Sequence, residues 1–574
     1  MRKFRLWAPK ADKVEIHING RIAPMSKVNQ QWWEYIFDSP KHCDYGFIVD
    51  GKGPYPDPRS NFQPHGVNGL SRTVDHNAFQ WSDNNWQSPP LSSAIIYELH
   101  IGTFTPQGTF EAVTEKIDYL KQLGITHIEL MPVCEFTGRR GWGYDGVDIF
   151  APHHYYGGPE GLKKLINACH CAQLGVIVDV VYNHFGLEGN YAEKFGPYMT
   201  KKYSTIWGNA FNYDDAFSDE PRKFIIDNAL MWLKDYHADG LRLDAIHAIY
   251  DQSAIHILEQ IAREVKKLEA QTGKHLFLIA ESDLNNPRIV QNFDIGGYGF
   301  NAQWSDDFHH SLHSILTGET NGYYEDFGRL ADLAKSIKNV FVFDGIYSTF
   351  RKAVHGRAAV NCDARNFLGY IQNHDQIGNR AKGDRISHIV SHEKAKIAAA
   401  IVFASPFIPM IFQGEEFAAS SPFQYFTDVS DEKLAKGISH GRKNEFTAFG
   451  WNPDEIPDPQ SQQTFYNSKL NWSEIQQPPH NSMLDWYKIL IQLRKSYPEL
   501  NNGSLEDVRV CFDETKRWIE IDRGQIEIIV NFADVFQEVE TKEKIAKIII
   551  KSDDRIELSE SKVNMPPVSI AILS

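Results

Sequence analysis

The chain is poor in cysteine, in basic charge and in long apolar stretches. Its 574 residues include six cysteines, scattered from Cys43 to Cys511, a usage typical of reduced thiols in a cytoplasm rather than of a disulfide framework. No apolar stretch approaches the length that spans a bilayer, and the basic N-terminus is not followed by the apolar segment of a signal peptide. We therefore expect a cytoplasmic protein with no membrane partner.

Acidic residues outnumber basic ones by 74 to 59, which gives a formal net charge of −15. Such a surface repels the phosphates of nucleic acids, so we expect no nucleic acid partner, and it suits a neutral substrate. Aromatic residues make up 13% of the chain. Their flat rings stack well on sugar faces, but large hydrophobic cores explain the same content equally well.

Three parts of the chain differ in their patterns. Residues 1–90 contain alternating strand-like segments separated by turn residues, and they predict an N-terminal β-sandwich similar to a carbohydrate-binding module. These segments are FRLWAP, VEIHING and WWEYIFD, followed by a Pro- and Gly-rich stretch, GKGPYPDPRSNFQPHGVNG, that predicts an ordered loop. Residues 491–574 predict a small C-terminal β-sandwich from five segments: RVCFDET, RWIEIDRG, IEIIVNFAD, KIAKIII and VSIAILS.

Residues 91–490 alternate short apolar, β-branched runs with amphipathic helical segments. This alternation predicts an α/β fold with a parallel sheet covered by helices, and eight repeats predict a closed (β/α)8 TIM barrel. The eight runs are 94–102, 125–133, 175–184, 240–245, 276–282, 299–306, 367–375 and 407–416.

Charged side chains interrupt these runs at their ends, where a barrel of this kind places its chemistry. Arg242 and Asp244 lie two residues apart on one strand, so they share a face and the guanidinium can keep the carboxylate ionised as a nucleophile. Glu281 comes from the next strand, where repulsion by Asp244 raises its pKa and suits it to act as a general acid. Asp375 enters from across the barrel. One such acid could be a buried ion pair, but the set predicts an active site.

The strand ends read DVVYNH, GLRLDAIH, IAESD and QNHDQIG, and in this order they resemble the four signature segments of the α-amylase family of glycoside hydrolases. The resemblance implies that Asp244 is the nucleophile, Glu281 the general acid/base and Asp375 the transition-state stabiliser of a retaining double displacement. It also implies that further residues grip the sugar in the cleavage subsite. These are Tyr144, His184, Arg242 and His374.

The N-terminal segment FRLWAPKADKVEI resembles the β-sandwich that precedes the barrel in branching enzymes and in trehalohydrolases. Segments such as GWGYDGVD and QWSDDFHHSLHSILTGE resemble one of these groups, the trehalohydrolases. These enzymes hydrolyse the α-1,4 bond next to the terminal trehalose of a malto-oligosyltrehalose. The resemblance implies this neutral α-glucan as substrate, no cofactor, and a functional pairing with a synthase that forms the trehalose end. It implies more substrate contacts, although His247 could equally be a buried, hydrogen-bonded histidine. These contacts are His247, Asp306, Asp307, His309, Gln376 and Asn379.

Other readings of the same residues remain open. No metal site is predicted, because His309 and His310 have no third ligand at a suitable spacing and Asn183 has no evident acidic partners downstream for calcium. A transglycosylase such as a branching enzyme would share the three carboxylates, and no local motif separates transfer from hydrolysis. A non-catalytic glycan-binding protein on the same barrel would usually have lost a carboxylate, and here all three are present.

Overall fold

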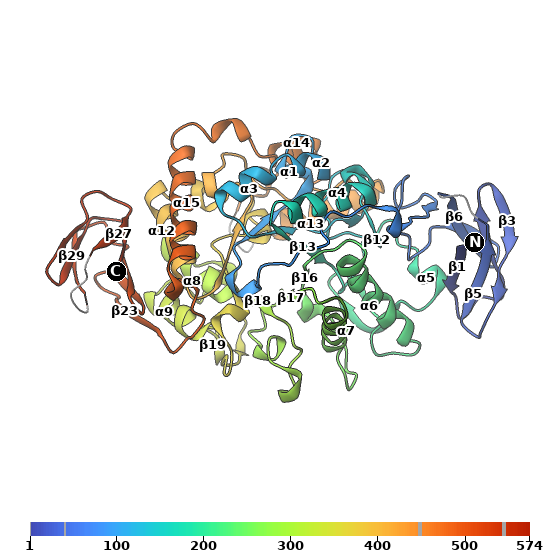
Figure 1. The fold of residues 1–574 in the computed structure, drawn as a ribbon, viewed down its shortest axis with the longest axis horizontal. Helices are drawn as coiled ribbons and strands as arrows, with labels where there is room; N and C mark the ends of the chain where they lie inside the picture. Colours follow the sequence, from blue (N-terminus) through green and yellow to red (C-terminus); the bar gives the residue numbers. More distant parts are fainter. Residues whose placement is uncertain (1, 39–41, 446–450, 542–546) are drawn as a thin grey trace.

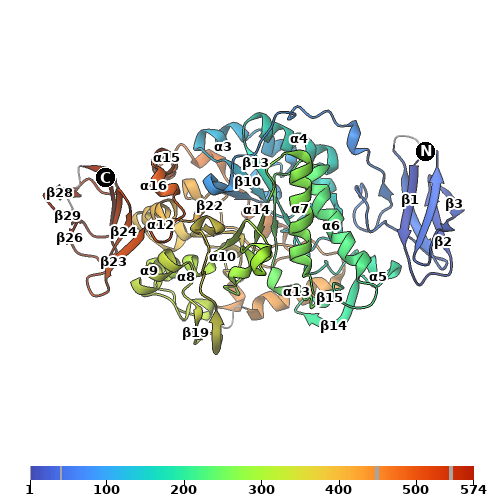
Figure 2. The same ribbon diagram turned by 60° about the horizontal axis from the view of Figure 1, so that its bottom comes forward.

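The structure is a computed structural model that describes residues 2–38, 42–445, 451–541 and 547–574. Its three parts follow one another along the long axis of the molecule. The N-terminal sheets lie at one end, the barrel and its helices in the middle, and the C-terminal sheets at the other end (Figure 1). A view turned by 60° keeps the two terminal parts at opposite ends (Figure 2).

The N-terminal part consists of two antiparallel sheets. The segments FRLWAP, VEIHING and WWEYIFD form β1 (Arg2–Trp7), β2 (Val14–Ile18) and β5 (Trp32–Phe37), as predicted. The side chains of β2 alternate between buried and half-buried, because one face of its sheet packs on the core. The predicted loop GKGPYPDPRSNFQPHGVNG begins with a short strand, β7. The remaining strands are β3 (Arg21–Pro24), β4 (Ser26–Lys27), β6 (Asp44–Val49), β7 (Lys52–Tyr55) and β8 (Ser71–Arg72).

The central part is a closed barrel of parallel strands, and each of the eight predicted apolar runs contains one of them. The predicted fold class is therefore confirmed. The strands are almost entirely buried because helices cover the barrel on the outside and side chains fill its interior. In barrel order they are β9 (Ile96–Leu99), β10 (His127–Leu130), β13 (Gly175–Val180), β16 (Gly240–Leu243), β17 (Phe277–Ala280), β18 (Ala302–Trp304), β21 (Phe367–Gly369) and β22 (Ile408–Phe412).

Amphipathic helices surround the barrel. The helix α7 shows the pattern clearly, since its apolar residues recur every three or four positions on the buried side, and it ends at Gly273 in a left-handed conformation. Between β17 and β18 the described chain forms only short 3-10 turns. The helices are α1 (Ile101–Phe104), α2 (Phe110–Thr114), α3 (Ile117–Leu123), α4 (Gly158–Cys171), α5 (Ala192–Phe195), α6 (Asp219–Lys234), α7 (Ile257–Thr272), α8 (Asp306–Thr317), α9 (Leu330–Asn339), α10 (His374–Gly378), α11 (Ile386–Ile389), α12 (His392–Ala404), α13 (Glu432–Glu445), α14 (Gln462–Asn467), α15 (His480–Ser496) and α16 (Pro498–Asn501).

Three small antiparallel pairs, which the sequence patterns did not predict, interrupt the alternation of strand and helix. The first pair, β11 with β12, carries between its strands the segment that contains Tyr144. The other two pairs are hairpins, one between β13 and α6 and one between α9 and β21. The strands are β11 (Cys134–Glu135), β12 (Asp148–Pro152), β14 (Met199–Thr205), β15 (Gly208–Phe211), β19 (Asp344–Ser348) and β20 (Ala353–Gly356).

The C-terminal part contains a five-stranded and a three-stranded antiparallel sheet. All five predicted segments contribute a strand to the larger sheet, although 542–546, which includes the start of KIAKIII, lies outside the described residues. Helix α15 runs through position 490. The domain boundaries at 90 and 490 both stay predictions. The strands are β23 (Val508–Asp513), β24 (Trp518–Arg523), β25 (Ile526–Asn531), β26 (Gln537–Glu540), β27 (Ile548–Lys551), β28 (Glu557–Ser559), β29 (Lys562–Met565) and β30 (Ser569–Leu573).

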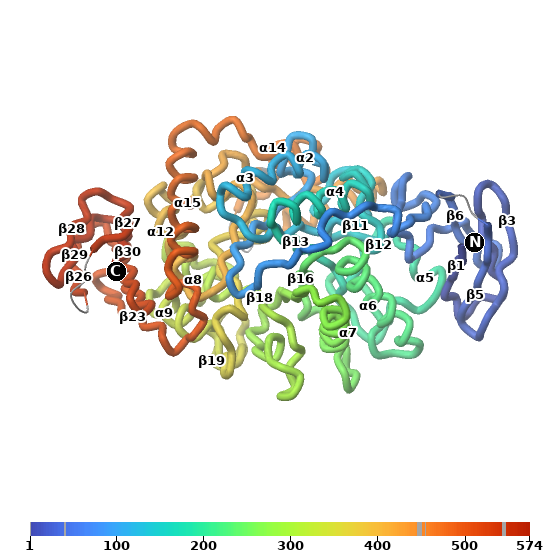
Figure 3. Tube along the Cα trace, in the orientation of Figure 1, coloured from blue at the N-terminus to red at the C-terminus, as the bar shows by residue number. Residues whose placement is uncertain are grey.

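The segment between the N-terminal sheets and β9 runs along the barrel (Figure 3), and a buried cluster of histidines and aspartates holds it there. Asp83 Oδ2 lies 2.8 Å from Nδ1 of both His170, on α4, and His237, after α6. Nε2 of His170 lies 3.0 Å from Oδ2 of Asp239, whose other oxygen accepts a 2.7 Å hydrogen bond from Trp86 Nε1. Within the described part of the chain, no helix is both long and apolar enough to cross a membrane.

Replacing Asp83 with asparagine should lower the free energy of unfolding by about 3 kcal/mol near pH 6, because it removes the charged partner of the half-buried His237 and one of the two carboxylate partners of the buried His170. The two histidines hold the pKa of Asp83 below its usual value despite burial, so its contribution is present above about pH 4 and is lost as the pH falls further. Against burial, Asp239 and Asp83 raise the pKa of His170, whose contribution is complete below about pH 6.5 and is lost at higher pH.

Thermal and urea unfolding at pH 3, 6 and 9 would measure this difference between wild type and Asp83→Asn. A matched control is Asp75→Asn, an exposed cap in the same connecting segment, which should change stability by less than about 0.5 kcal/mol. A difference for Asp83→Asn that stays the same at all three pH values would contradict the ionic character of the cluster.

Candidate active site

Arg242, on β16, is fully buried at the centre of the carboxylate group. Its Nη1 donates to Asp179 Oδ2 at 2.6 Å and to Asp244 Oδ1 at 3.1 Å, and its Nη2 lies 2.8 Å from Glu281 Oε2. The ring of Trp304 stacks on the guanidinium at 4.2 Å. One fixed cation therefore joins carboxylates from three neighbouring barrel strands. The contact between Arg242 and Asp244 is the one that their spacing in the sequence predicted.

The chain reverses sharply just after Asp244. Ala245 has a φ of 37°, in the left-handed region that residues with a Cβ rarely adopt. This turn aims the backbone N–H of Ala245 at Glu281 Oε2, at 2.7 Å. The adjacent strands also meet here through the 3.0 Å hydrogen bond from Glu281 N to Leu243 O. Glu281 is thus held by a backbone donor as well as by Arg242.

The second oxygen of Asp244 is held by Asn183, which follows β13. Asn183 Nδ2 donates to Asp244 Oδ2 at 2.8 Å and to the carbonyl oxygen of Asp244 at 2.9 Å. His184 contacts Asn183 through Nδ1 and stacks on Trp207, with ring centroids 4.4 Å apart. A cavity of about 240 Å³ opens beside these two rings, which places His184 on the wall of a cleft.

The environment separates the roles that the carboxyl groups can take. Burial raises the pKa of Glu281, and the charge of Asp244 raises it further, against the opposing effect of Arg242. Burial also raises the pKa of Asp179 to about 7 and that of Asp375 above its usual value. Glu281 is therefore the carboxyl group suited to carry the proton, while the carboxylate of Asp244 accepts two hydrogen bonds, from Arg242 and Asn183, that suit a charged group.

Asp375 lies in the first turn of α10, where its backbone N–H donates to Asn373 Oδ1 at 2.9 Å. Its carboxylate accepts a 3.2 Å hydrogen bond from Asn379 Nδ2 and lies 3.4 Å from His374 Nε2. The side chain is 34% exposed, against 10% for Asp244. Asp375 is therefore accessible and can contact a ligand directly.

Of the other predicted site residues, Tyr144 lies closest to the carboxylates, since its hydroxyl donates to Asp179 Oδ2 at 2.6 Å. His247 is exposed, with Nδ1 3.8 Å from Asp283 Oδ1, so it is not the buried histidine that we considered as the alternative. Asp306 and Gln376 meet, with Gln376 Nε2 3.4 Å from Asp306 Oδ1.

Two predicted contacts lie among protein groups instead. Asp307 Oδ2 accepts hydrogen bonds from the backbone N–H groups of Val342 and Phe343 and from Asn285, so it anchors the segment before β19. His309 is fully buried, with Nδ1 2.9 Å from Nδ1 of His310, and packs among aromatic rings. Substrate contact by either residue stays a prediction.

Sequence reasoning missed Glu98, on β9. Its carboxylate holds His374, and through that ring it reaches Asp375. The signal was available, because Glu98 is the only charged side chain in the apolar run AIIYELHIG. A charge in the middle of a fully buried barrel strand is costly unless it is paired.

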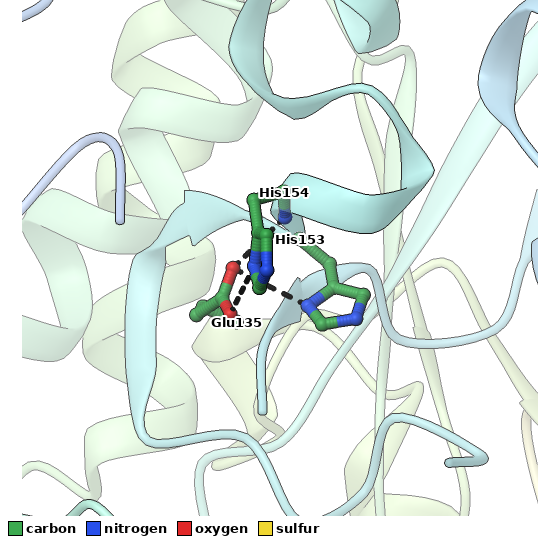
Figure 4. Close-up of side chains that lie close together, drawn as sticks. All are labelled: Glu135, His153 and His154. Atoms are coloured by element: carbon green, nitrogen blue, oxygen red, sulfur yellow. Dashed lines mark hydrogen bonds and ion pairs between the residues drawn. The ribbon is translucent and has the colours of Figure 1, made fainter. Parts of the chain in front are cut away.

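Within the described ranges, one group has the side chains and the proximity to hold a metal ion, namely Glu135, His153 and His154 (Figure 4). The two carboxylate oxygens of Glu135 accept hydrogen bonds from the backbone N–H and Nδ1 of His154, at 2.9 and 2.7 Å. His153 Nδ1 lies 3.3 Å from the same carboxylate. Protein donors therefore already occupy Glu135, and the cluster braces the base of the segment that carries Tyr144.

Comparison with known proteins agrees with this geometry. The sequence pattern of the alpha amylase catalytic domain matches residues 74–218 and 211–503. A malto-oligosyltrehalose trehalohydrolase from Rhizobium sp. (strain M-11) is 44% identical over 583 aligned positions, which cover 100% of this chain and 97% of the relative. The chain belongs to the malto-oligosyltrehalose trehalohydrolases of the α-amylase family.

Other members of this family, and one solved structure, are similar over most of their length. The malto-oligosyltrehalose trehalohydrolase from Saccharolobus solfataricus is 48% identical, over 86% of this chain and 85% of its own. A crystal structure of a protein from Salmonella typhimurium, provisionally described as an α-amylase, superposes with a TM-score of 0.91 at 34% identity. That match covers 100% of this chain and 97% of the other, so the N- and C-terminal sheets of this chain also have counterparts in the Salmonella structure.

Proposed function

We propose that the protein hydrolyses the α-1,4-glucosidic bond next to the terminal trehalose of a malto-oligosyltrehalose, releasing trehalose and a malto-oligosaccharide. The choice of chemistry depends on one observation, the guanidinium of Arg242 bridging Asp244 and Glu281. A shared cation of this kind is consistent with the short carboxyl separation, about 5 Å, of retaining glycosidases. The choice of trehalose as the leaving group depends on the names of the relatives.

In the first step the substrate lies in the cleft with its trehalose end beyond Glu281. Glu281 donates its proton to the glycosidic oxygen while Asp244 attacks the anomeric carbon, so the bond to trehalose breaks and a covalent glycosyl-enzyme forms. Arg242 and Asn183 keep Asp244 ionised and oriented for attack. Asp375, exposed to the cleft, binds sugar hydroxyls and favours the distorted, oxocarbenium-like ring.

In the second step Glu281, now ionised, takes a proton from a water molecule, which attacks the same carbon from the face that trehalose left. The bond to Asp244 breaks, and the malto-oligosaccharide leaves with its α configuration retained. Arg242 lies within 3.1 Å of both carboxyl groups, so it can compensate for whichever one carries the charge. No cofactor takes part in either step.

The proposal extends to the surroundings of the reaction. We propose α-glucan oligosaccharides as the ligands of the cleft and a synthase that forms the trehalose end as the functional partner, since that reaction must supply this substrate. Six free cysteines in the described residues are in keeping with the proposed cytoplasmic location. The residue roles and the domain boundaries at 90 and 490 are part of the same proposal.

Incubation with maltotriosyltrehalose and with maltopentaose tests the function. We expect maltotriosyltrehalose to be hydrolysed about 10- to 100-fold faster than maltopentaose, because the trehalose leaving group makes contacts with the protein that a maltose leaving group lacks. The products should be trehalose and maltotriose, the latter appearing first as its α anomer in ¹H NMR. New α-1,6 branches on amylose, or equal rates on the two oligosaccharides, would instead favour a branching enzyme or a general α-glucan hydrolase.

A further inference from the structure

Glu98 makes a two-point contact with His374 beneath the carboxylate group. Glu98 Oε2 accepts the backbone N–H of His374 at 3.1 Å, and Oε1 forms a very short contact with Nδ1 of the same residue. Both side chains are 1% exposed. On the opposite side of the ring, Nε2 of His374 lies 3.4 Å from Asp375 Oδ2. Glu98, His374 and Asp375 therefore form one chain from the barrel interior to the partly exposed carboxylate of Asp375.

The remaining surroundings keep the imidazole in one orientation. Tyr144 stacks on it with ring centroids 5.1 Å apart, and Trp142 and Trp304 meet it edge-on at 5.6 and 6.0 Å. A ring fixed by three aromatic neighbours and a bidentate carboxylate has little freedom to turn away from Asp375.

We propose that Glu98 is a positioning residue for the reaction: it keeps His374 in the imidazolium form, whose Nε2–H then holds Asp375 ionised and aimed into the cleft. This inference rests on the proposed function, in which Asp375 binds the sugar at the transition state. Glu98 itself touches no reacting atom and acts through His374.

The two contacts favour a proton on each ring nitrogen. Nδ1 must donate to the carboxylate of Glu98, and Nε2 faces a carboxylate oxygen of Asp375, where a lone pair would be repelled. The charged and titratable groups facing His374 are Glu98 on β9, His100 after it, Glu129 on β10, Tyr144, Arg242 on β16 and Asp375. Against burial, Glu98 and Asp375 raise the pKa of His374 to about 9. The imidazolium is thus complete well below pH 9 and is lost above it.

Glu98→Gln tests the proposal, because glutamine keeps the shape and the hydrogen-bonding capacity but removes the charge. We expect kcat on maltotriosyltrehalose to fall about 10- to 100-fold with a smaller change in KM. The ratio of variant to wild-type kcat should itself decline as the pH rises from 6 to 9. In the free protein, the NMR titration midpoint of His374, assigned by its loss in His374→Gln, should fall by about one to three pH units.

Glu129→Gln is the matched control. Glu129 pairs in register with Glu98 across β9 and β10, and it makes no hydrogen bond to His374 within the described residues. Burial and then Glu98 raise the pKa of Glu129 well above its usual value, so the substitution replaces one neutral group by another. In Glu129→Gln we expect the titration midpoint of His374 to stay at its wild-type value. The ratio of variant to wild-type kcat should stay level from pH 6 to 9.

A level ratio and an unchanged His374 midpoint in Glu98→Gln would overturn the proposal and reduce Glu98 to a structural role. If Glu98→Gln does not fold, His374→Gln serves instead and should show the loss of kcat of about 10- to 100-fold on maltotriosyltrehalose. Its ratio of variant to wild-type kcat should not decline as the pH rises, and a declining ratio would contradict the proposal. The NMR titration needs no substrate. A wild-type enzyme that releases no trehalose would therefore refute the proposed function while leaving the Glu98 test decisive.

Discussion

Replacing Asp244 with asparagine should lower kcat by about four to six orders of magnitude while the protein stays folded. Asparagine keeps the volume of the side chain and its place beside Arg242 and Asn183, but its amide cannot form the covalent bond to the anomeric carbon. The second carboxylate on the same guanidinium, Glu281, remains and still protonates the leaving oxygen. Steady-state kinetics on maltotriosyltrehalose, with the thermal midpoint as a check on folding, would measure the effect.

Chemical rescue distinguishes a lost nucleophile from a disturbed site. In Asp244→Ala the missing carboxylate leaves room for azide, which can attack the anomeric carbon directly and should give a glycosyl azide of inverted, β configuration. Rescue with retained configuration, or a loss of kcat below about 100-fold in Asp244→Asn, would remove Asp244 from the nucleophile role.

Replacing Glu281 with glutamine should lower kcat on maltotriosyltrehalose by about three to four orders of magnitude, because trehalose is a poor leaving group without a proton. The loss should be far smaller for the glycosylation step of an α-glycosyl fluoride, since fluoride leaves without protonation. The raised pKa of Glu281 extends the pH range in which the wild-type acid is protonated, and the rate should fall as the pH rises through that pKa. That alkaline limb of kcat/KM should be absent in the variant.

Asp283→Asn provides the matched control for Glu281. Asp283 lies two residues further along, is 45% exposed and pairs with Arg351 rather than with Arg242. Its substitution should leave the leaving-group dependence and the alkaline limb in place. A Glu281→Gln variant equally impaired on the fluoride and on the oligosaccharide would show that Glu281 supports the site in some way other than proton donation.

The barrel was predictable because its strands are buried on both faces and read as short apolar runs, all eight of which contain a strand. The meeting of Arg242, Asp244 and Glu281 was predictable for a related reason. A spacing of two on one strand fixes the first pair, and sequential strands of a barrel are neighbours, which brings the third residue beside them.

Contacts between distant strands were harder to predict. Glu98 and His374 are separated by 276 positions along the chain. No sequence periodicity indicates that β9, the first barrel strand, lies close to the end of β21, the seventh. The hydrogen-bond partners of Asp307 were equally hard to predict. Its place directly after a strand resembled that of the site acids, but the hydrogen-bond donors that it finds belong to residues 342–343, which only the tertiary fold brings near.

The carboxylate chain around Arg242 has a consequence for inhibition. Five carboxyl groups share two cations, so even with Glu281 and Asp179 both protonated the cleavage site carries excess negative charge. The groups are Glu98, Asp179, Asp244, Glu281 and Asp375, and the cations are Arg242 and His374. A sugar-shaped amine that is protonated in solution resembles the positively charged ring of the transition state and meets this field favourably. Such amines, and not anionic sugar acids, are the compounds from which to develop ligands for this cleft.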